Sequence, residues 1–198
     1  MRYSMFPWLI CSLLLAAILV LAGPNHFLSP PNSTKNQTLI GGDFELVNGN
    51  KQTVHAHDFR GRYMLVYFGF THCPDICPTT LLVIKNALDT LGPKKKLIAP
   101  VFITVDPERD TPKIMKQYTS NFSDNLVGLT GSLAQVKKAA NSYRVYFSKV
   151  AQNDSASEYL VDHSGFIYLM DKKGRYIAHF SHGISESELT QKLRQFIR

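Results

Sequence analysis

The sequence predicts an α/β domain, built as a three-layer sandwich around a mixed central sheet. Two observations predict it: apolar, β-branched runs of strand length alternate with segments of helical spacing, and the chain closes with a hairpin and a helix. The 198 residues are 44% hydrophobic and 11% aromatic, which is enough to bury a core and argues against disorder. No repeat period typical of a solenoid or propeller is present, so one globular domain is expected.

The first half of the domain begins with a short β-hairpin arm, indicated by the turn residues that end the segment 44–50. Residues 63–70 form an almost continuous apolar run, which is typical of a buried central strand. Residues 79–91 carry apolar side chains at helical spacing and predict the first helix of the domain. Residues 97–105 are again apolar and β-branched, and they predict a second buried strand.

The second half continues the alternation. Residues 111–119 begin with a capping threonine and Pro112 and predict a helix. A short strand is expected at 126–129, and a helix opened by a serine cap at 132–141. The last elements are an antiparallel hairpin, which turns at the sequence Lys-Lys-Gly-Arg, and a closing helix with acidic residues in its first turn. We place them at residues 166–171, 176–181 and 185–197.

The N-terminus has a composition of its own. Residues 6–22 are 17 consecutive uncharged residues, and Arg2 precedes them. We interpret residues 1–22 as a transmembrane anchor, with a cleaved signal peptide as the alternative, and either role exports the rest of the chain. Residues 23–38 are rich in Pro, Asn, Ser and Thr and are interpreted as a flexible tether. The folded domain is therefore expected at 39–198.

The net charge of +7 does not indicate a nucleic-acid-binding protein. Arg2 and Lys35 lie before the domain, which keeps 20 basic and 15 acidic residues. The lysines of the domain are scattered over a helix–strand turn, a helix face and a hairpin turn, and no basic stripe with interleaved aromatic residues is present. We expect a solvated surface that can also steer an acidic partner.

Cys73 and Cys77 are the residues that indicate chemistry. They follow the strand at 63–70 directly and open the next helix, an arrangement that belongs to the thioredoxin-like layout. Backbone N–H groups at a helix N-terminus favour the thiolate, which is the form that binds metal and attacks disulfides. A structural disulfide is the alternative, but it would close only a small loop and contribute little stability. The third cysteine, Cys11, lies within the apolar N-terminal run.

Three residues separate the two cysteines, where redox pairs of thioredoxin type have two. The wider spacing still permits a disulfide, but it also lets two thiolates converge on one soft cation, for which a third ligand is expected. Among the histidines, His163 is the one that a thioredoxin-like layout brings to the cysteine loop from far away in sequence. A site of two thiolates and one imidazole suits Cu(I), whereas structural zinc normally has four ligands. The other candidates are interpreted as non-ligands: His55, His57, His72, His179 and His182.

A second loop at the same sheet edge has the sequence Asp-Pro-Glu-Arg-Asp-Thr-Pro over residues 106–112. Its two prolines fix its shape, and Asp106 and Asp110 can cap turns or the following helix. Two interpretations stay open for this loop. It is either a rigid connection between strand and helix, or a segment that shapes the site or docks a partner.

These motifs together resemble the Sco/SenC family of thioredoxin-like copper proteins of cytochrome c oxidase assembly. The resemblance implies that Cys73, Cys77 and His163 are the copper ligands, with Cu(I) or also Cu(II) as the metal. It further implies delivery of copper to the binuclear site of cytochrome c oxidase subunit II, or reduction of the cysteines of that site. The matching segments are GDFEL at 42–46, FGFTHCPDICP at 68–78, VDPERDTP at 105–112, LTG at 129–131, YRVYF at 143–147, YLVDHS at 159–164 and FIYLMD at 166–171.

The leading hypothesis is therefore a membrane-tethered metallochaperone rather than a turnover enzyme. We expect a monomer in the bacterial inner membrane with its domain in the periplasm, or a soluble periplasmic protein if the N-terminal segment is cleaved. Its partners would be oxidase subunit II and an upstream copper donor or thiol reductant. The alternative is a thiol–disulfide oxidoreductase that uses Cys73 and Cys77, with metal binding incidental. A peroxidase on this fold is a weaker alternative, because no peroxide-activating arginine is identified.

Overall fold

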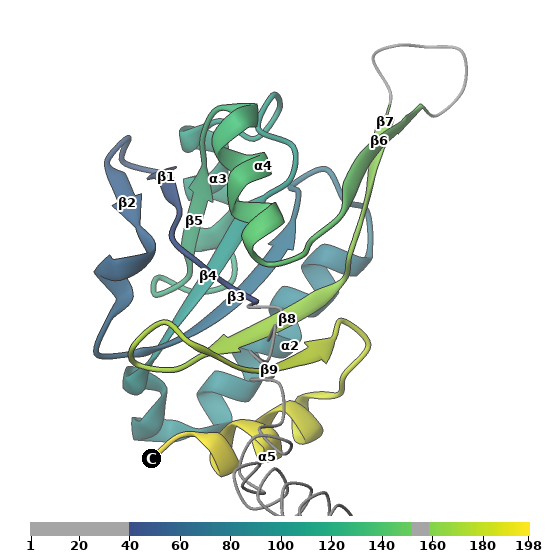
Figure 1. Ribbon diagram of the computed structural model, residues 1–198. Helices are drawn as coiled ribbons and strands as arrows, with labels where there is room; N and C mark the ends of the chain where they lie inside the picture. Colours follow the sequence, from purple (N-terminus) through teal and green to yellow (C-terminus); the bar gives the residue numbers. More distant parts are fainter. Residues whose placement is uncertain (1–39, 152–158) are drawn as a thin grey trace, which may run out of the picture. The chain divides into compact units, whose positions relative to one another are not determined.

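A computed structural model describes residues 40–151 and 159–198 and confirms the predicted α/β architecture with a mixed central sheet (Figure 1). The sheet has seven strands in the order β2-β1-β5-β4-β3-β8-β9. These strands are β1 (Glu45–Asn48), β2 (Thr53–His55), β3 (Tyr63–Gly69), β4 (Ile98–Thr104), β5 (Val127–Thr130), β8 (Phe166–Met170) and β9 (Tyr176–Ser181). The helices are α2 (Ile76–Thr90), α3 (Pro112–Ser120), α4 (Leu133–Ser142) and α5 (Glu186–Phe196), with 3₁₀ turns η2 (Ala56–Phe59) and η3 (Gly92–Leu97).

The centre of the sheet is parallel, and its flanks are antiparallel. Strands β3, β4 and β5 run in the same direction, and β3 pairs with β4 over its whole length, from Tyr63 opposite Ile98 to Gly69 opposite Thr104. All residues of β3 and β4 are buried, as their unbroken apolar sequence predicts. The loops that follow β3 and β4 therefore emerge at one edge of the sheet, where Cys73 lies in the first loop and Cys77 in the first turn of the helix that follows it.

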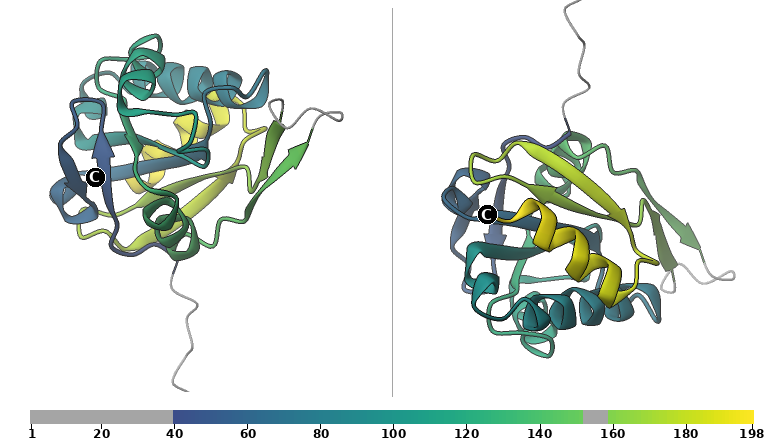
Figure 2. Two further views of the ribbon diagram at one scale, coloured as in Figure 1. Left: turned by 90° about the horizontal axis from the view of Figure 1, so that it is seen from above. Right: turned by 90° about the horizontal axis from the view of Figure 1, so that it is seen from below.

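The helices cover the two faces of the sheet unequally (Figure 2). On one face, Tyr67 and Phe102 of the strands stack with ring centroids 6.0 Å apart, and Tyr118 of α3 packs 5.8 Å from Phe102. Helices α2, α3 and α5 cover this face, and α5 is joined to α2 by a hydrogen bond from the Arg194 guanidinium to the Thr90 carbonyl (3.1 Å). On the other face, α4 ends at Tyr143, which packs against Phe68.

The predicted helix starts are confirmed by their capping bonds. The side chain of Ser132 accepts a hydrogen bond from the Gln135 N–H (3.2 Å) and opens α4. The Ser185 hydroxyl does the same for α5, with the Glu188 N–H at 3.2 Å. Each cap satisfies a backbone donor that a helix N-terminus would otherwise leave unpaired. The short hairpin arm is also confirmed, as β1 and β2 pair antiparallel.

The structure contains one sheet that the sequence prediction lacked. Strands β6 (Phe147–Ala151) and β7 (Tyr159–His163) form a separate antiparallel pair, in which Phe147 lies opposite His163. Their side chains are mostly half-buried or exposed, so the sequence shows no buried apolar run there.

The predicted anchor at 1–22 and tether at 23–38 lie outside the described residues. Within the described part of the chain, no helix has the length and apolar character to cross a membrane.

Candidate metal centre

The two cysteines occupy different positions at the start of α2. Cys77 lies in the first turn and is fully buried, whereas Cys73 lies in the preceding loop and is half-buried. Both are free thiols. The Cys77 N–H donates a hydrogen bond to Cys73 Sγ at 3.4 Å, while Asp75 at the N-cap makes no capping bond with its side chain. The sulfur of Cys73 thus takes the place of a capping acceptor, a role that favours its ionised form.

Two residues of β3 define the position of the Cys77 sulfur. A Cβ atom at Gly69 would stand 2.7 Å from Cys77 Sγ, so only glycine lets the helix approach the strand this closely. On the same strand, the buried Tyr67 hydroxyl donates to Cys77 Sγ at 3.8 Å. Burial raises the pKa of Tyr67, which therefore keeps its proton and remains a donor.

His163 reaches the cysteines from the end of β7. Its Nε2 atom lies 4.0 Å from Cys77 Sγ. Its Nδ1 atom lies 2.9 Å from the Val161 carbonyl oxygen, which can only accept a hydrogen bond. This bond assigns the ring proton to Nδ1 and leaves the lone pair of Nε2 facing the sulfur, as a metal ligand requires. The Phe70 ring packs edge-on against the imidazole, with centroids 5.8 Å apart. The predicted meeting of His163 and the cysteine loop is present in the structure.

The two thiols share a proton unequally. The hydrogen bond from the Cys77 thiol lowers the pKa of Cys73 to about 5, with help from the backbone N–H groups of the helix start. The same hydrogen bond, together with burial, raises the pKa of Cys77. At neutral pH the pair therefore consists of an accessible Cys73 thiolate and a buried Cys77 thiol. This pair is suited both to soft-metal binding and to nucleophilic attack.

The loop between β4 and α3 holds the cysteine loop in place through hydrogen bonds. Asp110 is fully buried and accepts hydrogen bonds from the Thr71 N–H (3.1 Å), the Thr71 hydroxyl (2.5 Å) and the Thr104 hydroxyl (2.6 Å). Thr71 lies two residues before Cys73. The carboxylate of Asp110 therefore connects the end of β4 with the segment that carries the half-buried Cys73.

The same loop also contacts the β6–β7 hairpin. The buried Asp106 accepts a hydrogen bond from the Tyr159 hydroxyl at 2.8 Å and forms an ion pair with Arg109. The Arg109 guanidinium lies 3.7 Å from the centroid of the Tyr159 ring, a cation–π contact. Tyr159 begins the strand that His163 ends. Of the two interpretations of this loop, the structure supports a role in shaping the site, because the loop bonds to the segment that carries Cys73 and to the strand that carries His163.

The remaining histidines of the described chain have their printed contacts with groups other than the two sulfurs. The His72 ring faces Thr71 and Asp110, with Nδ1 at 3.1 Å from the Thr71 hydroxyl. His55 and His57 stack on each other at 4.9 Å on the hairpin arm and η2. The last two contact other groups: His179 contacts the Tyr176 hydroxyl, and His182 faces the Gly165 carbonyl.

The site opens into a cavity of about 300 Å³. His182, interpreted from the sequence as a non-ligand, lines this cavity together with Cys73 and His163. No group of three or more His, Cys, Asp or Glu side chains in residues 40–151 and 159–198 is arranged to hold a metal ion as it stands. The donor types fit a soft cation: Cys73 and His163 line the cavity, and the buried Cys77 sulfur behind them lies 4.0 Å from His163 Nε2.

Fold and site together define a thioredoxin-like protein with a dithiol–imidazole centre. The SCO1/SenC family model matches residues 32–198, and the chain belongs to this family. A SCO2-like protein of Rickettsia prowazekii is 43% identical over 160 residues, which are 81% of this chain and 78% of the relative. Copper-bound ScoI of Bradyrhizobium japonicum is similar with TM-score 0.72 and 41% identity, covering 79% of this chain and 99% of that one. Copper-bound ScoI of Arabidopsis thaliana is similar with TM-score 0.76 and 40% identity, covering 80% of this chain and 98% of that one.

Proposed function

We propose that this chain is a copper-binding metallochaperone of cytochrome c oxidase assembly, with Cys73, Cys77 and His163 as the ligands of its copper cargo. The observation that carries the proposal is the position of Cys77, whose sulfur lies 4.0 Å from an imidazole Nε2 with its lone pair toward it and whose N–H donates to Cys73 Sγ. The copper-bound ScoI structures of two relatives at about 40% identity support copper as the metal. Thiolate and imidazole donors in this number favour Cu(I).

Copper loading on this pair displaces one proton. Cys73 is already a thiolate at neutral pH, whereas the Cys77 thiol gives up its proton when copper binds. Cys73 is half-buried and lines the cavity beside His163, so its thiolate can be reached from the cavity. A three-coordinate copper leaves room for an acceptor's cysteine to approach through the cavity. Transfer then proceeds by exchange of one thiolate for another.

The acceptor that we propose is the binuclear copper site of cytochrome c oxidase subunit II. We further propose that residues 1–22 anchor the protein in the bacterial inner membrane, with the domain in the periplasm as a monomer. A soluble periplasmic protein is the alternative if the segment is cleaved. The uncharged run at residues 6–22 supports the anchor.

Anaerobic titration of the reduced protein with Cu(I), against a competing chelator, tests the ligand set. We expect one copper per chain in the parent and a large loss of affinity in Cys73→Ser, Cys77→Ser and His163→Ala. His179→Ala is the matched control, because His179 contacts Tyr176 and does not line the cavity of the site. If His163→Ala binds copper as tightly as the parent, the ligand assignment is wrong.

A thiol–disulfide reductase is a second candidate, favoured by the asymmetry of the two thiols. In this reaction the Cys73 thiolate attacks a partner disulfide and forms a mixed disulfide, releasing one partner thiolate. Cys77 then attacks Cys73, so the partner leaves as a dithiol and the pair becomes a disulfide. Cys77→Ser should trap the mixed disulfide. Reduction that stays unchanged in His163→Ala would favour this function over copper transfer.

A further inference from the structure

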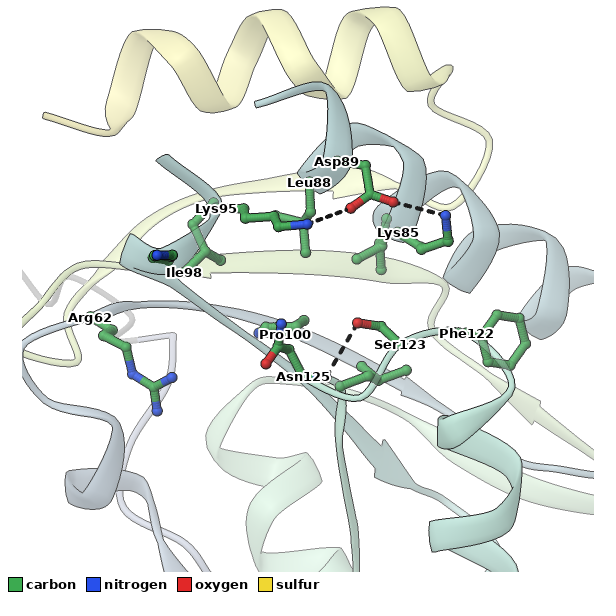
Figure 3. A pocket seen from close by; sticks show the side chains of 13 residues that line it. Arg62, Lys85, Leu88, Asp89, Lys95, Ile98, Pro100, Phe122, Ser123 and Asn125 are labelled. Atoms are coloured by element: carbon green, nitrogen blue, oxygen red, sulfur yellow. Dashed lines mark hydrogen bonds and ion pairs between the residues drawn. The ribbon is translucent and has the colours of Figure 1, made fainter. Parts of the chain in front are cut away.

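A second cavity of about 300 Å³ lies at the other end of the parallel strands, away from the cysteine loop (Figure 3). It is bounded by α2, by the first residues of β4 and by the segment 122–126 that follows α3. Arg62, just before β3, lines another side of it (Figure 3). Its apolar lining consists of Ile84, Leu88, Ile98, Pro100, Phe122 and Leu126.

The cavity exists because β4 begins before its pairing with the neighbouring strand β5 does. β4 begins at Ile98, but its pairing with β5 starts only at Val101, opposite Val127. Beside the first three residues of β4 the sheet has no neighbour on that side. Pro100 occupies the last of these positions and has no N–H group, so it leaves no unpaired donor there. The lining beside β4 is thus largely apolar side chain, with Ser123 and Asn125 as its uncharged polar members, and Pro100 adds no unpaired N–H donor.

The rim of the cavity is strongly basic. Four cationic side chains line it against a single carboxylate, that of Asp89. Asp89 accepts hydrogen bonds from both Lys85 and Lys95, each at 2.8 Å, and Figure 3 shows the two ammonium groups reaching it from opposite sides. Arg62 and Lys96 form no ion pair with any carboxylate in residues 40–151 and 159–198. At the rim, Arg62 and Lys96 are therefore available to bind an anion above the apolar lining.

We propose that this cavity binds a small amphipathic carboxylate of the medium-chain fatty-acid class. The apolar floor receives the alkyl chain, and the carboxylate meets Arg62 and Lys96 at the rim. The volume stands at the lower end of the range of small-molecule pockets, which matches a chain of roughly eight carbons and excludes a whole two-chain phospholipid. Binding here lies well away from Cys73 and Cys77, so the bound anion does not compete with the metal centre.

NMR titration of the ¹⁵N-labelled domain 39–198 tests the proposal with octanoate as the probe and octanol as its uncharged counterpart. The domain is suitable because 79% of this chain covers 99% of the solved Bradyrhizobium ScoI chain, so this fold forms without the N-terminal residues. We expect saturable shifts at Ile84, Leu88 and Ile98, with octanol bound at least fivefold more weakly. The double variant Arg62→Gln/Lys96→Gln should bind octanoate about fivefold to tenfold more weakly, as expected for two exposed charge contacts.

Lys94→Gln is the matched control, because Lys94 lies in the same 3₁₀ turn as Lys96 but does not line the cavity. It should bind octanoate like the parent. Equal binding of octanol and octanoate, an equal loss in Lys94→Gln, or shifts spread over the surface would overturn the proposal. A separate arm adds phosphatidylglycerol vesicles. If the vesicles bind through the same residues and octanoate does not displace them, the site recognises a lipid surface instead. That result would also overturn the proposal.

Discussion

Asp110→Asn tests how firmly the loop after β4 holds the cysteine loop. Asp110 is fully buried, and its two carboxylate oxygens accept three hydrogen bonds, two from Thr71 and one from Thr104. Asparagine has almost the same shape but offers only one acceptor oxygen, and its amide group turns two N–H donors toward the existing donors. At least one buried donor therefore loses its acceptor.

The magnitude follows from those three bonds. A buried donor left without its partner costs about 1–3 kcal/mol, and hydrogen bonds to a charged acceptor weaken further when the charge is removed. We expect the free energy of unfolding of Asp110→Asn to fall by about 2–4 kcal/mol, a large part of the roughly 5–15 kcal/mol that keeps a domain folded. Copper affinity should fall as well, because Thr71 precedes Cys73 by two residues.

Urea unfolding of the apo domain, followed by circular dichroism, measures the first effect, and Cu(I) competition measures the second. Asp124→Asn is the matched control, since Asp124 is exposed. It should unfold within about 0.5 kcal/mol of the parent. An Asp110→Asn domain that is as stable as the parent would refute the idea that this carboxylate holds the site together.

Three further predictions follow from the same geometry. The alkylation rate of Cys73 by iodoacetamide should stay high from pH 8 to pH 6 and fall by half near the Cys73 pKa of about 5, because the thiolate is lost below that pH. Buried Cys77 should stay unmodified. A midpoint above pH 8 would contradict the lowering of the Cys73 pKa by the Cys77 thiol. Gly69→Ala should destabilise the domain by about 1–3 kcal/mol and weaken Cu(I) binding, since its Cβ would stand 2.7 Å from Cys77 Sγ. Unfolding and copper titrations that match the parent would show that α2 can move away from β3 without loss of stability. Tyr159→Phe should cost about 1–2 kcal/mol in urea unfolding through the bond that Asp106 loses, and equal stability would show that the hairpin is held elsewhere.

The sequence predicted the central fold well because its signals are local and strong. The apolar runs of β3 and β4 have the length of buried strands, and Ser132 and Ser185 cap the helices that they precede. The cysteine pair could be placed at the strand end for the same reason. His163 was found by topology, since no local pattern distinguishes it from the other histidines.

The supports of the site could not be predicted, because each depends on contacts between distant segments. Tyr159 lies 53 residues from Asp106, and its strand has too little apolar patterning to be recognised. The contact between Gly69 and Cys77 likewise appears only when the helix packs on the strand. The sequence also placed the helix at 79–91, whereas α2 begins at Ile76 and includes Cys77, and Cys73 precedes it and accepts a hydrogen bond from the Cys77 N–H.

X-ray absorption at the copper edge, on the Cu(I)-loaded protein, tests the central claim most directly. The claim is that Cys73, Cys77 and His163 bind one copper ion together. The parent protein should show two sulfur scatterers and one imidazole nitrogen per copper, and His163→Ala should lose the nitrogen but keep both sulfurs. Identical spectra for the parent and His163→Ala, or a single sulfur scatterer in the parent, would contradict the claim.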